Sequence, residues 1–261
     1  MEPLLQMSGI QMVYNHKSVG LEHIDLTVKK GEFIVIIGPS GAGKSTLLRC
    51  INLLVLPTGG KISFLDKRDI QELSGNKLRQ LRGQIGMIFQ NYNLISRASV
   101  LENVLHGRLG HINPIRGLFG LYSKEDRAYA ISLLEHIGLG DHMYKRADEL
   151  SGGQMQRVGI CRALCQNPQL MLADEPIASL DPKSASDVMN ALYDNCHEKG
   201  ITCIANLHQV DVAKKYATRI IGVRKGRIVF DGPPDTLTPE IISKLYKGKE
   251  ENEDDAVYTA V

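Results

Sequence analysis

The chain has 261 residues, with 31 Lys and Arg against 29 Asp and Glu, so its formal net charge is +2. This balance provides no bulk attraction for a polyanion, and we expect no nucleic-acid partner. No apolar run approaches the roughly 18 residues that span a bilayer, and no signal-peptide pattern opens the chain. The five cysteines form no C-x-x-C pair. We therefore expect reduced thiols in the core of a cytosolic protein.

Three β-rich segments are predicted at the N-terminus, within residues 4–14 and 21–37, with turn residues at 15–20 and 29–31. Tyr14 ends the first of them. Its ring could stack on an adenine, because a base offers a π-face to any flat side chain. It could equally be a half-buried tyrosine at a strand end, and the local sequence leaves both interpretations open.

The segment after the third strand carries the pattern G-x-x-x-x-G-K-[ST] and reads Gly38-Pro39-Ser40-Gly41-Ala42-Gly43-Lys44-Ser45-Thr46. An apolar run precedes it and helix-spaced apolar residues follow, so it joins a strand to a helix. Glycines let backbone N–H groups turn toward phosphate oxygens, and the helix dipole favours an anion there. Lys44 can reach the β- and γ-phosphates, and the Ser45 hydroxyl can ligate Mg²⁺. The loop therefore predicts binding of a nucleoside triphosphate.

The middle of the chain changes from strands to helices. A strand is expected at residues 61–65 after a turn at 57–60, and a short apolar run over 85–89 ends at Gln90. From about residue 91 to 164 the apolar spacing becomes helical, which predicts a helical subdomain inserted into the core.

Two details of this predicted subdomain stand out. Ser123 and Asp126 form a plausible capping pair at the start of a helix. Residues 107–122 hold four glycines and a proline among apolar residues, which predicts a loop that is either floppy or a contact surface.

A second glycine-rich element reads Leu150-Ser151-Gly152-Gly153-Gln154. Ser151 suits an N-cap, and Gln154 stands at the capping-box position of the following helix. Glycine is a poor helix former, and no local need explains two glycines in the first turn. Their bare N–H groups would suit a phosphate. Because one phosphate loop already exists, we expect this second anion site to receive a γ-phosphate that another chain presents.

Two acids end a predicted apolar strand over residues 170–173. A buried strand would deliver Asp174 beside the phosphate loop, where a carboxylate can hold Mg²⁺ directly or through water. Strand alternation would send the Glu175 side chain to the opposite side, where it could act as the base for water attacking the γ-phosphate. A solvated acidic turn is the alternative.

The remaining elements alternate in type: a helix from Pro182, a strand over 201–206, a helix, and strands over 220–223 and 227–230. This order predicts an α/β fold with a mostly parallel sheet, an N-terminal antiparallel β subdomain and the inserted helical subdomain. We expect one domain over residues 1–248. The rest, 249–261, is acidic and predicted to be disordered.

Taken together, the motifs resemble those of the ATP-binding-cassette (ABC) ATPases, a family with a P-loop NTPase core, and the resemblance extends over about residues 3 to 240. The segments that carry it are, in family order, Gly38–Thr46, Gln90, Leu150–Gln154, Leu170–Glu175, Ser179–Asp181 and His208. The resemblance implies that residues 38–46 are the Walker A loop and that residues 150–154 are the signature. It implies ATP and Mg²⁺ as ligands.

The same resemblance assigns the remaining roles. Glu175 would be the catalytic glutamate and His208 the switch histidine that contacts the γ-phosphate. Gln90, in the Q-loop, would join Ser45 and Asp174 at Mg²⁺. Asp181 would be the D-loop acid, which is compatible with its also capping the helix from Pro182, and Tyr14 would be the adenine-stacking aromatic.

A head-to-tail dimer follows from the family mechanism, with each ATP between the Walker A loop of one chain and the signature of the other. Two other classes of protein fit the sequence less well. Cassette ATPases that act on DNA or ribosomes usually need a long coiled coil or a second cassette, and this chain has neither. A nucleotide sensor without hydrolysis would not need Glu175 and His208.

A finer resemblance to the bacterial phosphonate-importer ATPases rests on residues 93–110, 173–182 and 206–232. It implies a permease, a substrate-binding protein and a peripheral position on the cytoplasmic face of the inner membrane. None of these residues would touch the transported solute, so phosphite, a phosphate ester or an amino acid remain alternative cargoes.

Overall fold

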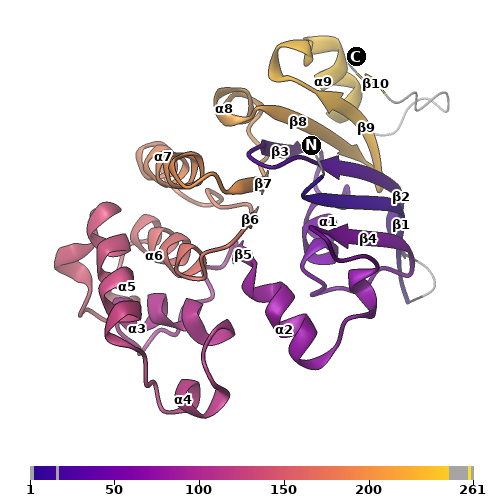
Figure 1. Cartoon of the computed structure of the whole chain (residues 1–261). Helices are drawn as coiled ribbons and strands as arrows, with labels where there is room; N and C mark the ends of the chain where they lie inside the picture. Colours follow the sequence, from indigo (N-terminus) through magenta and orange to yellow (C-terminus); the bar gives the residue numbers. More distant parts are fainter. Residues whose placement is uncertain (1–2, 16–17, 247–257, 260–261) are drawn as a thin grey trace. The chain divides into compact units, whose positions relative to one another are not determined.

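The computed structural model describes residues 3–15, 18–246 and 258–259, and it divides into two compact units (Figure 1). Residues 1–73 and 202–261 form one of them, called here the two-segment unit. Residues 74–201 form the other, called the inserted unit. Of residues 249–261, predicted to be disordered, the structure describes only 258–259, which form a short strand, and the acidic run over 250–255 lies outside the described residues.

The two-segment unit is built on a sheet with the strand order β4-β1-β2-β9-β8-β3-β7. Its strands are β1 (Leu5–Tyr14), β2 (Ser18–Val28), β3 (Phe33–Ile37), β4 (Gly59–Phe64), β7 (Thr202–Asn206), β8 (Arg219–Arg224), β9 (Arg227–Gly232) and β10 (Tyr258–Thr259). Its helices are α1 (Lys44–Ile51), α8 (Val210–Tyr216) and α9 (Pro239–Tyr246), with 3₁₀ turns η1 (Ile70–Glu72) and η5 (Pro234–Thr236).

Strand direction separates this sheet into two parts. β1 pairs antiparallel with β2 and with β4, whereas β3 pairs parallel with β7 and β8. All residues of β3 and β7 are buried, as expected of parallel strands covered on both faces. β9 runs antiparallel to β8, and β10 lies parallel to β9. The sequence-based prediction of a parallel core with an antiparallel N-terminal part is confirmed.

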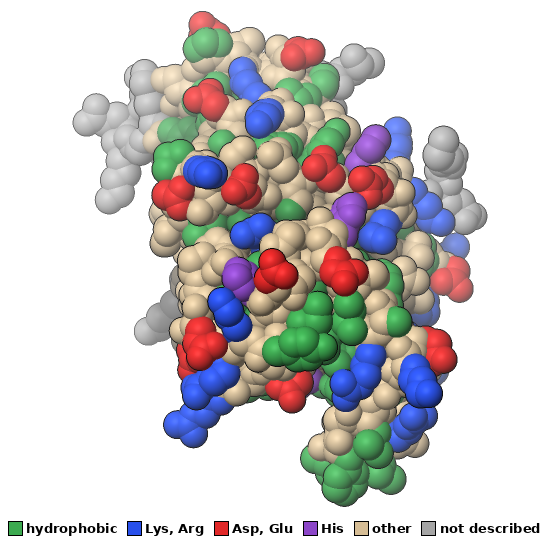
Figure 2. Space-filling view, turned by 90° about the vertical axis from the view of Figure 1, so that its left-hand side faces the viewer, with side chains coloured by type: hydrophobic (Ala, Val, Ile, Leu, Met, Phe, Trp, Pro, Cys, Tyr) green, Lys and Arg blue, Asp and Glu red, His purple; other side chains and the backbone are tan. Residues whose placement is uncertain are grey.

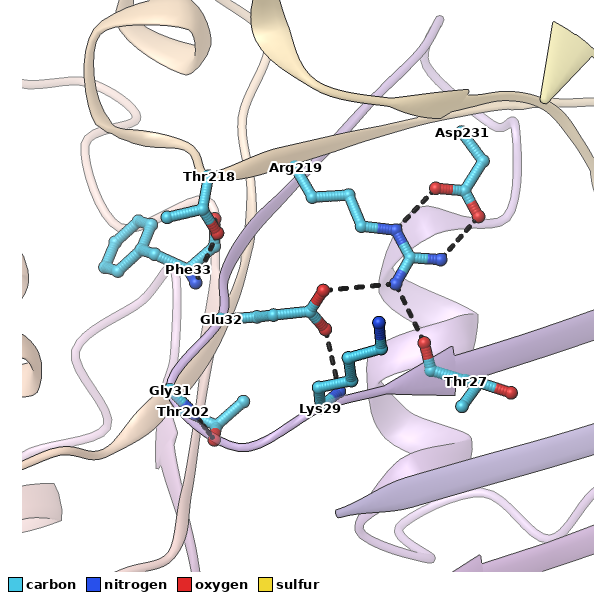
Figure 3. Close-up of polar contacts among 9 residues, drawn as sticks. All are labelled: Thr27, Lys29, Gly31, Glu32, Phe33, Thr202, Thr218, Arg219 and Asp231. Atoms are coloured by element: carbon cyan, nitrogen blue, oxygen red, sulfur yellow. Dashed lines mark hydrogen bonds and ion pairs between the residues drawn. The ribbon is translucent and has the colours of Figure 1, made fainter. Parts of the chain in front are cut away.

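A network of polar contacts fixes the amino ends of the parallel strands (Figure 3). Arg219 at the start of β8 donates two hydrogen bonds to Asp231, at 2.5 and 2.6 Å, and others to Glu32 and to the carbonyl of Thr27. The hydrogen bonds to Asp231 are the first cause of a raised Arg219 pKa. Thr218 accepts a hydrogen bond from the backbone of Phe33 at 2.9 Å. β3 is thereby held at its start, and the glycine-rich loop over residues 38–46 leaves from its other end.

The inserted unit is mainly helical, with one parallel strand pair, β5 (Ile85–Ile88) and β6 (Leu170–Asp174). Its helices are α2 (Gly75–Gly83), α3 (Val100–Leu105), α4 (Pro114–Leu118), α5 (Lys124–His136), α6 (Gly152–Cys165) and α7 (Pro182–Glu198), with 3₁₀ turns η2 (His106–Gly110), η3 (Gly140–His142) and η4 (Ala147–Glu149).

Local sequence rules account for several helix starts in this unit. Ser123 caps α5 by accepting a hydrogen bond from the backbone N–H of Asp126 at 3.0 Å, as predicted. Asp181 caps α7, with Pro182 in the first turn. The prediction of a loop over residues 107–122 is wrong in part, because the segment contains most of η2 and the whole of α4. Asn113 caps α4 and Pro114 fits its first turn, a start signal that the glycines of the segment obscured.

The five cysteines are buried free thiols, as the sequence predicted. Among the residues that the structure describes, no helix combines the length and the apolar composition needed to cross a bilayer.

Candidate functional site

The loop between β3 and α1 has a backbone that only glycine adopts easily. Gly38, Gly41 and Gly43 have φ angles of 149°, 77° and 105°. A Cβ on Gly38 would lie 2.1 Å from the carbonyl oxygen of Val223, and one on Gly43 would lie 2.4 Å from that of Gly20. Gly38 and Gly43 are therefore required both by the dihedral angle and by the close approach of a neighbouring strand, and Gly41 by its dihedral angle. Gly43 is the N-cap residue of α1, so the loop ends at a helix N-terminus.

Lys44 holds its charge inside this loop. The side chain is buried, and its ammonium donates hydrogen bonds to the carbonyls of Gly38 at 2.8 Å and Pro39 at 3.0 Å. A buried ammonium at a helix N-terminus, in a loop whose glycines admit close backbone contact, is a donor set that matches phosphate oxygens. The loop residues therefore fit a polyphosphate.

Tyr14 lies beside the first turn of α1. Its hydroxyl is 3.2 Å from the Thr46 hydroxyl, and a Cβ added to Gly20 would come within 2.7 Å of its ring. The structure thus brings this aromatic ring to the phosphate loop, although 32 residues separate Tyr14 from Thr46.

His208 follows β7, the strand that pairs with β3. Ile36 of β3 is in register with Asn206 of β7, and Leu207 donates a backbone hydrogen bond of 3.0 Å to Ile36. Because parallel strands end together, His208 and the phosphate loop leave the sheet at the same edge. The two-segment unit therefore gathers Tyr14, residues 38–46 and His208 at one edge.

In the inserted unit, Gln90 lies in a tight segment just after β5. Tyr92 and Asn93 have positive φ angles of 56° and 50°, a conformation that is uncommon outside glycine. Arg162 of α6 donates hydrogen bonds to the carbonyls of both residues, at 2.9 and 2.5 Å. Burial lowers the pKa of the Arg162 guanidinium. A second residue of α6, Gln156, donates a long hydrogen bond of 3.5 Å to the carbonyl of Phe89. Helix α6 thus holds both ends of the Gln90 segment.

The α6 helix itself starts with the predicted capping box. The Ser151 hydroxyl accepts from the N–H of Gln154 at 3.3 Å, and the Gln154 side chain accepts from the N–H of Ser151 at 2.9 Å.

The two glycines of this turn, for which the local sequence offered no reason, have a tertiary packing reason. A Cβ on Gly152 would lie 2.8 Å from the Tyr92 hydroxyl, and one on Gly153 would lie 3.0 Å from the Ser184 side chain. The glycines make room for the Gln90 segment and for α7.

Asp174 and Glu175 differ in backbone conformation as well as in position. Asp174 is the buried last residue of β6, whereas Glu175 follows the strand with a φ of 51°. The prediction that strand alternation orients Glu175 is therefore wrong, since the strand has ended and the backbone is left-handed there. A non-glycine residue in this region carries a strain of about 1–3 kcal/mol, which clusters at functional sites.

Asp181 is held by the start of α7. Its carboxylate accepts hydrogen bonds from the backbone N–H groups of Lys183 and Ser184, at 3.1 and 3.0 Å. Hydrogen bonds from Ser184, first from its hydroxyl, lower the pKa of Asp181. Ser179, two positions earlier, has a φ of 65°. The capping role predicted for Asp181 is confirmed.

Comparison with known proteins identifies this constellation. A family model described as ABC transporter matches residues 21–178. The chain belongs to the ABC transporter family. A curated relative, Phosphonates import ATP-binding protein PhnC 2 of Halalkalibacterium halodurans, is 53% identical over 94% of this chain and 100% of its own. Phosphonates import ATP-binding protein PhnC of Treponema denticola is 50% identical over 92% of this chain and 94% of its own.

Solved ABC structures share the fold. The ADP conformation of the ATP-binding cassette MJ1267 aligns with a TM-score of 0.81 at 30% identity, covering 95% of this chain and 100% of that one. A dimeric post-hydrolysis state of the cassette MJ0796, bound to ADP and Pi, aligns with a TM-score of 0.78 at 32% identity, covering 88% and 98%. The predicted fold class and the predicted family are both confirmed.

Two residues of this ABC protein that hold the Gln90 segment were not singled out from the sequence. Gln156 and Arg162 lie on α6 at ordinary helical positions, and nothing in their local sequence marks them. Their role becomes visible only when the carbonyls that they contact are known.

Proposed function

We propose that the chain is the ATP-binding and ATP-hydrolysing subunit of an ABC importer that takes up phosphonates. The observation that carries the proposal is that several curated relatives, each about 50% identical over most of the chain, bear the name of a phosphonate-import ATP-binding protein. Loop geometry supports the nucleotide-binding part of this proposal, because residues 38–46 offer a charged, glycine-lined donor set at a helix N-terminus.

In this proposal the phosphate loop and its neighbours bind the nucleotide. Lys44 and the backbone N–H groups of residues 38–46 contact the β- and γ-phosphates. These donors stabilise the negative charge that develops on the phosphate oxygens in the transition state. Tyr14 stacks on the adenine, a role supported by its contact with Thr46 beside the loop.

In this proposal the reacting end of the nucleotide is served by the two acids at and just after the end of β6 and by three polar side chains. Ser45, Gln90 and Asp174 would hold Mg²⁺, which neutralises phosphate charge when bound. Glu175 accepts the proton of the attacking water, and its strained backbone is consistent with a fixed functional geometry. His208 donates a hydrogen bond to the γ-phosphate.

A second copy of the chain completes each site. Ser151, Gly152, Gly153 and Gln154 contact the γ-phosphate that the other copy presents, and Asp181 lies in the D-loop. Support for a head-to-tail dimer comes from the dimeric structures described for the cassette MJ0796. The subunit would bind membrane permease subunits on the cytoplasmic face of the inner membrane and serve a substrate-binding protein through the complex.

One substitution tests the hydrolytic role. Glu175→Gln keeps the shape of the side chain and removes its basicity, so ATP hydrolysis should fall by at least about 10²-fold while ATP binding survives. Lys44→Ala is the contrasting variant, in which nucleotide binding itself is lost. Near-normal turnover of the Glu175→Gln protein would reject the assignment.

The cargo has its own test. A strain that lacks this chain, and has no second importer, should fail to grow with 2-aminoethylphosphonate as the sole phosphorus source and should grow normally on phosphate. Undiminished growth and uptake would reject phosphonate as the cargo, and growth tests on phosphite and on phosphate esters would then identify the alternative.

A further inference from the structure

The residues on either side of Asp181 pack against the glycine pair that starts α6. Leu180 precedes Asp181, and its Cδ2 atom would lie 3.3 Å from a Cβ added to Gly152. Ser184 follows in the first turn of α7, and its Cβ would lie 3.0 Å from a Cβ added to Gly153. Glycine leaves room for both neighbours because it has no Cβ. Asp181 therefore lies between two points of contact with the same turn.

Ser184 also contacts Asp181 itself. The backbone N–H of Ser184 donates to the Asp181 carboxylate at 3.0 Å, and the N–H of Lys183 donates to the same oxygen at 3.1 Å. The hydrogen bond from the Ser184 hydroxyl is the first cause of the lowered pKa of Asp181, because a donor to a carboxylate favours its charged form. One small side chain thus contacts Asp181 through its hydroxyl and Gly153 through its Cβ.

Local helix rules do not explain the hydroxyl of Ser184. This residue is the third of α7, a position where glutamate or glutamine commonly completes a capping box, and serine is a poorer helix former than alanine. The approach of Gly153 requires a small side chain, and alanine would satisfy that requirement as well. The hydroxyl therefore has its use in the contact with Asp181.

We propose that Ser184 is a positioning residue that fixes Asp181 relative to residues 151–154, called here the signature turn, so that one chain presents both to the nucleotide of a second copy. This inference rests on the proposed function, in which the signature turn of one copy meets the γ-phosphate held by the other. A geometry set before the copies meet spares the dimer the cost of ordering these groups at the interface.

The first test uses Ser184→Ala in the full chain. The variant keeps both backbone hydrogen bonds that cap α7, so its melting temperature and its affinity for ATP as a monomer should match the wild type. The kcat for ATP should fall about three- to tenfold, because water replaces only part of a hydrogen bond to an exposed carboxylate.

Ser132→Ala is the matched control, because it also removes one hydroxyl, which donates to the Tyr129 carbonyl at 2.8 Å. Ser132 is exposed on α5, the helix at the left of Figure 1, and Figure 2 faces that side of the molecule. This control should keep the wild-type kcat. An equal fall of kcat in the two variants would overturn the positioning role, since the loss would then come from removing any hydroxyl of the inserted unit.

A second test asks in which chain Ser184 acts. A heterodimer of Lys44→Ala and Ser151→Arg chains has one intact composite site, built from the phosphate loop of the Ser151→Arg chain and the signature turn of the Lys44→Ala chain. Adding Ser184→Ala to the Lys44→Ala chain should lower the ATPase activity about three- to tenfold. Adding it to the Ser151→Arg chain, whose signature turn is already disabled, should leave the activity unchanged. A merely structural defect would act equally in either chain.

The contrary results separate this inference from the proposed function. Equal losses from the two placements of Ser184→Ala, or no loss from either, would overturn the positioning role and leave the proposed function intact. An undiminished effect of Ser184→Ala in an Asp181→Ala background would also overturn it, because the hydroxyl would then act on another group. Inactivity of the parent mixture in proven heterodimers would overturn the independent composite sites that the inference requires. Failure of the wild type to hydrolyse ATP would reject the proposed function itself.

Discussion

Arg162 offers a sharp test of how the inserted unit positions Gln90. Its guanidinium donates to the carbonyls of Tyr92 and Asn93, two residues with left-handed backbones that lie two and three positions after Gln90. Arg162→Met keeps the stem of the side chain and its helix propensity, and it removes both donors and the charge. The two carbonyls would then lose their charged partner.

The magnitude follows from these contacts. A hydrogen bond from a charged donor contributes about 1.5–3 kcal/mol, and water can replace part of that at the more exposed Asn93 carbonyl. The left-handed backbones of Tyr92 and Asn93 carry a strain of about 1–3 kcal/mol each, and the hydrogen bonds from Arg162 offset it. Without Arg162, the backbone around these two residues should relax to a less strained conformation. We therefore expect the free energy of unfolding to fall by about 2–3 kcal/mol, with displacement of Gln90.

Three measurements on the isolated subunit check this reasoning: urea unfolding, affinity for a fluorescent ATP analogue, and steady-state ATP hydrolysis. With the roles proposed above, the kcat for ATP should fall at least tenfold, because misplacing a catalytic group by about 1 Å costs that much or more. The ATP affinity, assigned in that proposal to residues 38–46, should change little. The matched control is Arg108→Met. Arg108 forms an ion pair of 2.6 Å with Asp126 and a hydrogen bond to the Cys165 carbonyl, so this variant should lose similar stability without losing kcat. Equal kcat losses in the two variants would refute the positioning role.

Two further predictions concern the dimer and the buried thiols. A mixture of Ser151→Arg and Lys44→Ala chains should recover partial ATPase activity that each variant lacks alone, because one of the two composite sites in the heterodimer would be intact. If proven heterodimers recover no activity, the two sites are not independent sites that each combine residues of both chains. Burial raises the pKa of Cys50 and Cys165 to about 12. The folded chain therefore keeps these two protons at pH values at which the unfolded chain has lost them. As a result, the free energy of unfolding should fall as the pH rises above the ordinary thiol pKa of about 8.5. Each buried thiol lowers the free energy of unfolding by up to about 1.4 kcal/mol per pH unit in this range. In urea titrations, Cys50→Ala should therefore make the decline of the free energy of unfolding between about pH 8 and pH 10 shallower.

The sequence by itself determined the elements whose chemistry is written in consecutive residues. The loop over residues 38–46 is contiguous, and its glycines, lysine and serine in a strand–loop–helix context match the pattern of a phosphate-binding loop. The caps at Ser123, Ser151 and Asp181 depend only on residues two or three positions ahead, which is why they could be predicted and were found. The parallel core followed from the order of apolar strands and amphipathic helices.

Only the tertiary structure decided features that depend on what lies opposite a residue. Gly152 and Gly153 gain a packing reason because Tyr92 and Ser184 approach them, and Tyr14 at the end of β1 meets Thr46 of α1. Arg162 holds carbonyls 69 and 70 positions away, and no local pattern encodes such a pairing. The same holds for the exposed apolar residues of α4 and the turn after it. Leu118 and Phe119 are exposed in the structure, although their residue types are usual in a core. Whether such a side chain is buried depends on which other residues lie against it in space, and the local sequence does not determine that.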